Sequence, residues 1–252
     1  MHMDMHKAGI ARAFGRAAAD YERHAGLQRD SGDRLMELLG PQPGRCLLDA
    51  GCGTGWFSRR WQQEGSLVVA LDLSPAMLDE ARRNQSASAY LTGDIERLPL
   101  ADASVDICFS NLAVQWCDDL PRALAEFYRI TRPGGLIALS TLAEGSLGEL
   151  QRAWSQVDQA VHINRFLTPG TIDLAFAPYR HRLAAARHTL HYPHLSALLH
   201  GLKGVGAGYL RSGRTPGLTG RQRLARLDAA WQRQAAGLPL SYQLIYGLIY
   251  RD

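Results

Sequence analysis

The stretch Leu47-Leu48-Asp49-Ala50-Gly51-Cys52-Gly53-Thr54-Gly55 decides the fold of this chain. Its apolar first half predicts a buried strand, and its alternating glycines predict a tight turn before a helix that starts near Trp56. Glycines after a first strand let the backbone approach a ligand closely, and the N-terminus of the following helix favours negative charge. The stretch therefore predicts a small-molecule site at the end of this strand.

Strand and helix patterns alternate from this stretch to about residue 142. The predicted strands are residues 45–50, 66–72, 90–92, 105–110 and 136–142. The predicted helices between them are residues 56–64, 74–84 and 120–130. Because right-handed crossovers are nearly obligatory between parallel strands, this order indicates an α/β fold with a mostly parallel, doubly wound sheet.

The two flanks add helices before this core and a looser pattern after it. We expect one domain of 252 residues, with a helical arm at 1–40, a core at 41–142 and a second half at 143–252. Helices are predicted over residues 9–39, 147–161, 168–177, 194–202 and 221–235, and strands over 183–192 and 240–250. Residues from about 194 to 237 are predicted to form a cap inserted between the last two strands.

Composition limits the class of protein. The hydrophobic share of 46% and the charged share of 21% are ordinary for a globular protein, and no run of about 18 apolar residues predicts a membrane span. The chain start lacks the apolar segment of a secretory signal, which favours the cytoplasm. The four cysteines form no Cys-x-x-Cys pair, so neither a zinc site nor a disulfide framework is predicted.

The net charge of +4 is unevenly distributed. From residue 180 onward the acidic residues are Asp228 and Asp252 only. The basic residues there are Arg180, Arg182, Arg187, Lys203, Arg211, Arg214, Arg221, Arg223, Arg226, Arg233 and Arg251. This excess indicates either a solvated basic face or attraction of an acidic partner, such as an acidic protein, a phosphate-bearing substrate or RNA.

The spacing of the glycines separates two cofactor classes. A dinucleotide site needs Gly-x-Gly-x-x-Gly, whereas here the third glycine, Gly55, comes one residue early. The pattern Asp-x-Gly-x-Gly-x-Gly instead resembles the first motif of class I S-adenosylmethionine (AdoMet) methyltransferases. Four further features follow in the order of that family, namely Asp72, Gly93-Asp94-Ile95, Ser110-Asn111-Leu112 and Pro133-Gly134-Gly135.

This resemblance implies AdoMet as the methyl donor and a seven-stranded Rossmann-like sheet with one antiparallel strand. Asp72 matches the acid that holds the ribose hydroxyls, and Asp94 lies in the segment beside the adenine. Asp49 has two open roles, contact with the charged amino end of the donor or anchoring of the glycine turn through its N–H groups. The expected donor-binding residues are Tyr21, Asp49, Gly51, Cys52, Gly53, Gly55, Asp72, Leu73, Asp94, Ile95, Asn111 and Leu112.

The flanks resemble a narrower family, the malonyl-acyl-carrier-protein O-methyltransferases of biotin synthesis. The motifs that carry this resemblance include Phe14-Gly15-Arg16-Ala17-Ala18, Asn111-Leu112-Ala113-Val114-Gln115-Trp116, His162-Ile163-Asn164-Arg165-Phe166-Leu167 and Leu202-Lys203-Gly204-Val205-Gly206-Ala207. The resemblance implies methylation of the free carboxylate of a malonyl thioester on acyl carrier protein, giving the methyl ester that starts pimeloyl synthesis. An acidic carrier protein would suit the basic second half, and malonyl-coenzyme A stays open as an acceptor.

Such a reaction needs no catalytic acid or base and no metal, because a carboxylate is already ionised at pH 7. It does need a group that aims one carboxylate oxygen at the methyl group, and an arginine fork suits this role. Arg165 is the first candidate and Arg16 the second, with Gln115 and Trp116 beside the acceptor. Arg165 could instead brace the cap, and Tyr21 and Trp116 could simply pack.

Three other functions remain open from the sequence. An AdoMet-dependent C- or N-methyltransferase, for example in a quinone pathway, would often need a general base. An RNA methyltransferase would fit the basic charge, but the basic residues lack interleaved aromatics and a recognised RNA module. A binding protein with the AdoMet fold but no catalytic activity would not need intact donor-binding residues, and in this sequence these residues are intact.

Overall fold

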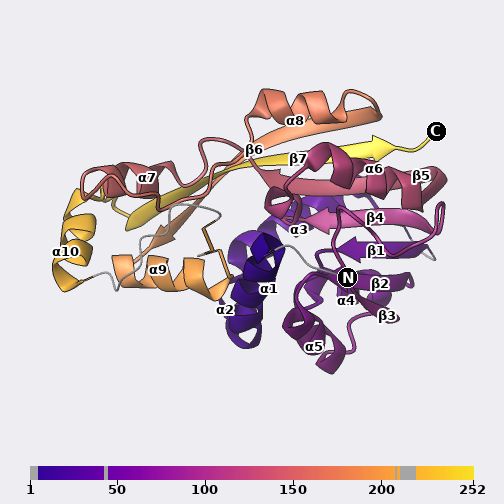
Figure 1. The fold of residues 1–252 in the computed structure, drawn as a ribbon, viewed down its shortest axis with the longest axis horizontal. Helices are drawn as coiled ribbons and strands as arrows, with labels where there is room; N and C mark the ends of the chain where they lie inside the picture. Colours follow the sequence, from indigo (N-terminus) through magenta and orange to yellow (C-terminus); the bar gives the residue numbers. More distant parts are fainter. Residues whose placement is uncertain (1–4, 43–44, 208, 211–219) are drawn as a thin grey trace.

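The computed structural model describes residues 5–42, 45–207, 209–210 and 220–252, and these contain a seven-stranded sheet (Figure 1). The strand order is β3-β2-β1-β4-β5-β7-β6. The strands are β1 (Cys46–Ala50), β2 (Leu67–Asp72), β3 (Ala89–Thr92), β4 (Val105–Asn111), β5 (Thr131–Leu142), β6 (Arg180–Tyr192) and β7 (Leu238–Tyr250). Only β7 runs antiparallel to its neighbours, β5 and β6, so the predicted doubly wound sheet with one antiparallel strand is confirmed.

Helices cover both faces of this sheet. The helices before β5 are α1 (Met5–Ala17), η1 (Ala18–Asp20), α2 (Tyr21–His24), α3 (Gly26–Leu39), α4 (Trp56–Gln63), α5 (Pro75–Arg83), η2 (Val114–Trp116) and α6 (Leu120–Ile130). Those after β5 are α7 (Gly148–Ser155), α8 (Pro169–Phe176), α9 (Leu195–Gly204) and α10 (Arg221–Ala230). None of these described helices is long and apolar enough to cross a membrane.

Alternate residues of the central strands fill two separate cores. On one face, Leu47 and Phe109 pack with Trp61 of α4 and Leu35 of α3, all fully buried. On the other face, Leu48 and Cys108 pack in a cluster that α6 and α8 complete with apolar side chains. A sheet that is buried on both faces needs apolar residues in both registers, which explains the continuous apolar runs of the sequence.

The structure differs from the sequence prediction mainly at element ends. The single helix predicted for residues 9–39 is divided into α1, η1, α2 and α3, with the last break at Ala25. Glycine is a poor helix former, so the chain bends readily before Gly26. The helices predicted at 147–161 and 221–235 end early, at Ser155 and Ala230, and β5 begins before its predicted start.

The elements after β5 gather at one end of the sheet (Figure 1). There α7, α9 and α10 lie around the C-terminal end of β6 and the N-terminal end of β7. The C-terminal end of β7 lies at the opposite side of the molecule. Both α9 and α10 lie between β6 and β7 in the chain, as the predicted cap does. Part of the predicted cap, with Arg211 and Arg214, lies outside the described residues.

The packing around Gly55 predicts that a side chain there lowers the free energy of unfolding. Its φ of +83° is left-handed, and an added Cβ would lie 2.0 Å from Ser86 Oγ. Gly65 has a similar φ of +87° but open space around it. We expect Gly65→Ala to lower the free energy of unfolding by about 1 kcal/mol and Gly55→Ala by about 1–3 kcal/mol more, as urea unfolding would measure. Equal losses would contradict the packing contribution.

Candidate active site

A cavity of about 90 Å³ lies at the carboxyl ends of β1, β2 and β4, and we name it the turn cavity. Such a position is where ligands bind in doubly wound sheets. Nine of the twelve residues predicted to bind a donor line it, namely Tyr21, Gly51, Gly53, Asp72, Leu73, Asp94, Ile95, Asn111 and Leu112. The structure therefore brings residues from five separate segments of the sequence to one place.

The glycine turn is held against the end of β2. The backbone N–H groups of Gly51 and Cys52 both donate to the Leu71 carbonyl oxygen, at 2.8 and 3.0 Å. Asp72 Oδ2 accepts the N–H of Gly53 at 2.9 Å, and its Oδ1 accepts the N–H of Ser74 at 2.7 Å. Asp72, rather than Asp49, thus anchors the glycine turn through a backbone N–H group.

Burial raises the pKa of two carboxyl groups at the glycine turn, those of Asp49 and Asp72. Burial raises the pKa of Asp49 to about 7, although the Ser58 hydroxyl donates to its Oδ2 at 2.6 Å and opposes the shift. Burial also raises the pKa of Asp72 to about 6, against the opposing hydrogen bonds from Ser74 and Gly53. Asp49 and Cys52 lie on the far side of the glycine turn, in a smaller cavity that Tyr21 also lines.

Gly55 lines neither of these two cavities. It is the residue that precedes α4, where its left-handed backbone turns the chain into the helix. Its Cα instead faces Ser86 and Ala81, which leave no room for a side chain. Gly55, which the glycine pattern predicted as a donor-binding residue, is thus required for packing and does not line the cavity.

Hydrogen bonds fix the end of β4 against α3 and β5. Asn111 Nδ2 donates to the Gln28 carbonyl oxygen at 2.8 Å, and Ser140 Oγ donates to Asn111 Oδ1 at 2.7 Å. The next residue, Leu112, has a left-handed φ of +50°, which is costly for a residue other than glycine. The surrounding bonds keep Leu112 in this conformation, at the boundary of the turn cavity and the cavity described next.

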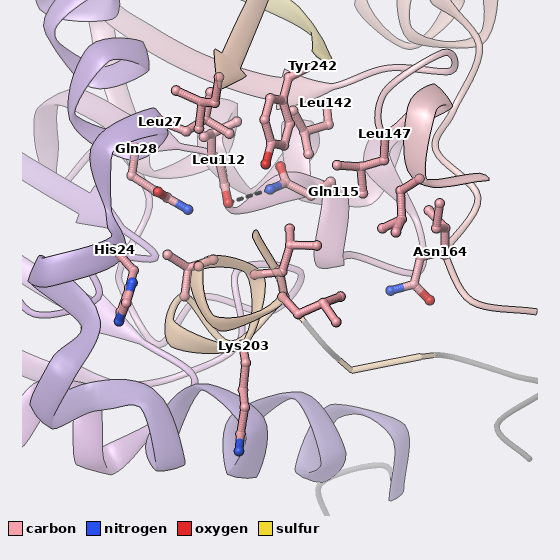
Figure 2. Close-up of a pocket in the computed structure, with 18 of the residues that line it drawn as sticks. His24, Leu27, Gln28, Leu112, Gln115, Leu142, Leu147, Asn164, Lys203 and Tyr242 are labelled. Carbon is pink, nitrogen blue, oxygen red and sulfur yellow. Dashed lines mark hydrogen bonds between the residues drawn. The ribbon is translucent and has the colours of Figure 1, made fainter. Parts of the chain in front are cut away.

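A larger cavity of about 280 Å³ lies between the arm, β4 and the cap, and we name it the cap cavity (Figure 2). Most of its lining is apolar, including Leu27, Leu142, Leu147, Leu150 and Trp154. It shares four lining residues with the turn cavity, namely Phe14, Tyr21, Leu112 and Trp116. Phe14 and Trp116 meet edge to face with ring centroids 5.2 Å apart, so they form a wall between the two cavities.

Few polar groups reach the cap cavity. The Gln28 side chain and the Tyr242 hydroxyl point into it, whereas Lys203 extends away from it (Figure 2). Gln28 Oε1 is buried and accepts no hydrogen bond from any described residue. Gln115 Nε2 donates to the Leu112 carbonyl oxygen at 2.7 Å, which supports the strained end of β4.

The two arginines predicted to hold the acceptor lie elsewhere. Arg165 is exposed and lines a fourth cavity, with Asp118 and Asp119, that shares Gln115, Leu142 and Phe166 with the cap cavity. Arg16 is exposed on α1 and lines none of the cavities found among the described residues. Of the four predicted acceptor residues, the structure brings only Gln115 and Trp116 to the cap cavity.

Lys7 and Cys117 also line the turn cavity and were not predicted as site residues. Lys7 has no distinctive sequence context, and Cys117 lies just past the Asn111 motif that could have suggested it. Gln28 lines the cap cavity from α3, just after the bend at Ala25. No group of three metal-ligating side chains occurs within the described ranges.

Comparisons with known proteins agree with this geometry. Residues 48–139 match the model of a family described as a methyltransferase domain. The solved structure of an S-adenosylmethionine-dependent methyltransferase from Thermotoga maritima has the same fold, with a TM-score of 0.58 and 17% identity over 96% of this chain and 100% of that one. The match over residues 48–139 and the shared fold are those of the methyltransferase class.

Relatives of nearly full length narrow this class. The malonyl-[acyl-carrier protein] O-methyltransferase of Pectobacterium atrosepticum is 58% identical over 98% of this chain and 97% of its own length. That of Serratia marcescens is 55% identical over 98% of this chain and 97% of its own length. The chain belongs to the malonyl-[acyl-carrier protein] O-methyltransferase family, as its flanking motifs predicted.

The raised pKa of Asp49 predicts how stability changes with pH. Between about pH 4 and 7 the folded carboxyl keeps a proton that the unfolded chain releases, so the free energy of unfolding falls as pH rises. Asp49→Asn removes this titration, and we expect the fall between pH 5 and 7 to shrink by about 2 kcal/mol. Urea unfolding at several pH values measures it, with exposed Asp79→Asn as the control that keeps the parent slope.

Proposed function

We propose that this enzyme transfers the methyl group of AdoMet to the free carboxylate of a malonyl thioester on acyl carrier protein. The product is the malonyl methyl ester that starts pimeloyl and biotin synthesis, and we assign the reaction to the cytoplasm. The acceptor rests on the names of the relatives and on the motifs that the chain shares with them. One observation carries the chemistry, namely that the turn cavity and the cap cavity meet at a common wall.

The turn cavity suits AdoMet. Gly53 lines it, and the nearest atom to an added Cβ would be Tyr21 Cε1 at 3.9 Å, so a side chain there would extend into space that the donor needs. Asp72 would hold the ribose hydroxyls, while Asp94 and Ile95 would contact the adenine. Bound AdoMet supplies a sulfonium methyl group that an oxygen nucleophile can attack. Tyr21 lines all three cavities around the glycine turn and would close the arm over the bound donor.

The cap cavity suits an acceptor that is already a nucleophile. None of its described lining residues is an aspartate or a glutamate. His162 is stacked on Trp154 at 3.7 Å and bonded to Asp158 at 2.8 Å, so its ring is committed to structure rather than to proton abstraction. A carboxylate needs no base, and its charge cancels against the sulfonium charge during transfer. A dry apolar cavity therefore lowers the barrier, and alignment of the two reactants adds to this.

The acceptor carboxylate must still be oriented, and we assign this role to Gln28 in place of an arginine. Its amide N–H group would donate to one oxygen and leave the other free to attack. A neutral donor binds a carboxylate less tightly than an arginine fork does, so it withdraws less charge from the nucleophile. Arg165 stays the alternative through the Gln115 and Phe166 wall that its cavity shares with the cap cavity.

The carrier protein would dock on the cap, where most of the unpaired positive charges described from residue 180 onward lie. Several bases of the second half are already engaged, since Arg223 pairs with Asp158, Arg233 with Asp228, and Arg251 binds main-chain carbonyls. Lys203, Arg221 and Arg226 form no ion pair with a described residue, and all three belong to the cap. These unpaired charges suit an acidic protein partner near the cap cavity.

Variants of Gln28 test the proposed acceptor geometry. Gln28→Leu removes the donor, and we expect kcat/KM for malonyl-carrier protein to fall about tenfold. Gln28→Glu should lower it further because two carboxylates repel. Steady-state kinetics at saturating AdoMet measures both, beside Arg165→Lys. If Arg165→Lys loses the rate and Gln28→Leu keeps it, the arginine holds the carboxylate.

The proposed reaction and docking face are tested with three acceptors across a range of salt. We expect the methyl ester to form fastest from malonyl-carrier protein, more slowly from malonyl-coenzyme A and hardly at all from free malonate. Raising salt from about 0.05 to 0.5 M should shrink the preference for the carrier. Formation of no ester from any malonyl thioester would refute the proposed function.

A matched pair of charge reversals separates the cap from the rest of the basic half. Arg221→Glu/Arg226→Glu changes two bases of α10 in the cap, and Arg180→Glu/Arg182→Glu changes two bases at the opposite end of β6. We expect only the α10 variant to raise KM for malonyl-carrier protein, by about tenfold, with little change for malonyl-coenzyme A. An equal effect of both variants would show that net charge alone attracts the carrier.

A further inference from the structure

The N-terminal arm brings a buried positive charge to the turn cavity. Lys7 of α1 is only 6% exposed and lines the cavity together with Asp94 and Cys117. Its ammonium group bonds Asp94 Oδ1 at 3.0 Å and also bonds Glu96, which is 7% exposed. A lysine is rarely buried unless it is paired, so this group is held in place by its two carboxylates.

Glu96 is itself fixed by backbone groups. Its carboxylate accepts the N–H groups of Asp118 and Asp119, at 3.1 and 2.8 Å. Lys7 therefore joins the arm to the segment after β3 and, through Glu96, to the turn before α6. Burial lowers the pKa of Lys7, but the bonds to Glu96 and Asp94 outweigh that effect and raise it, so the ammonium stays charged.

The two carboxylate oxygens of Asp94 differ in the hydrogen bonds that they accept. Oδ1 accepts both the Lys7 ammonium group and the N–H of Glu96, the latter at 3.0 Å. Oδ2 accepts no hydrogen bond from any described residue, although Asp94 lines the turn cavity. With one oxygen occupied on two sides, the carboxylate cannot rotate freely. Its second oxygen is thus a preoriented acceptor at the edge of the cavity.

We propose that Lys7 is a positioning residue for the methyl donor, which it serves by orienting Asp94 so that Oδ2 accepts the 6-amino group of adenine. The proposal rests on the proposed function, because it takes AdoMet as the ligand of the turn cavity. It also gives the arm a role in selectivity. A purine with a 6-oxo group offers an acceptor where adenine offers a donor, so the oriented oxygen would repel it.

Binding of two product analogues tests this role without any acceptor. S-adenosylhomocysteine and S-inosylhomocysteine differ at the purine 6-position, and calorimetry gives their Kd values. We expect the parent enzyme to prefer the adenosyl ligand at least about tenfold. Lys7→Met should weaken adenosyl binding about tenfold and inosyl binding less, so that the ratio of the two Kd values falls toward one.

Two further variants keep the outcome interpretable. Lys7→Met/Glu96→Gln removes the unpaired buried charge that could unfold the single variant, and it should show the same loss of the ratio. Arg12→Met, at an exposed position of the same helix, should keep the parent ratio. If the Lys7 variants weaken both ligands equally, or keep the ratio, Lys7 only braces the arm and the proposal fails. If the parent enzyme binds neither ligand, the proposed function fails as well.

Discussion

The closure of the glycine turn on the end of β2 is the constraint on which the rest of this structure depends. The Leu71 carbonyl oxygen accepts two N–H groups of the turn, and the Asp72 carboxylate accepts a third. These bonds satisfy backbone donors that would otherwise be left over where β1 ends and α4 has not begun. The third bond also orients the Asp72 carboxylate, whose pKa burial raises and this hydrogen bond lowers. The same bonds therefore shape the turn and prepare its carboxylate for a ligand.

A conformation as specific as this one must be supported from outside the turn. Ser86 and Ala81 fill the space beside Gly55, and Ala113 does the same beside Gly51. The end of β4 carries a left-handed Leu112 that is held by Ser140 and Gln115. Strain of this kind persists only where the surroundings determine it, and here the strained residue borders both cavities. The local strain and the position of the site are thus two consequences of one packing arrangement.

The sheet supplies only the floor of the site, and the arm and the cap supply its walls. Lys7, Phe14 and Tyr21 of the arm line the turn cavity, and Phe14 with Trp116 separates it from the cap cavity. On the cap side, Trp154 contacts both the His162 ring and the Arg223 guanidinium. Aromatic and charged groups in these walls exclude water while keeping few ionisable groups near the reacting atoms. That division suits a transfer between a cation and a carboxylate, in which a wet site would favour the separated charges.

The sequence by itself determined the sheet, the glycine turn and most of the residues around it. These features depend on near neighbours, since strand and helix periods, the spacing of Gly51, Gly53 and Gly55, and strand-end acids such as Asp72 are all written within a few residues. Only the tertiary structure decided which side chains from distant segments share a cavity. It set Arg165 in a cavity apart from the cap cavity, exposed Arg16, and brought Lys7 to Asp94 across 87 positions of sequence. The reason is physical, because the direction of a side chain depends on where its helix bends and packs, and no local pattern encodes that packing.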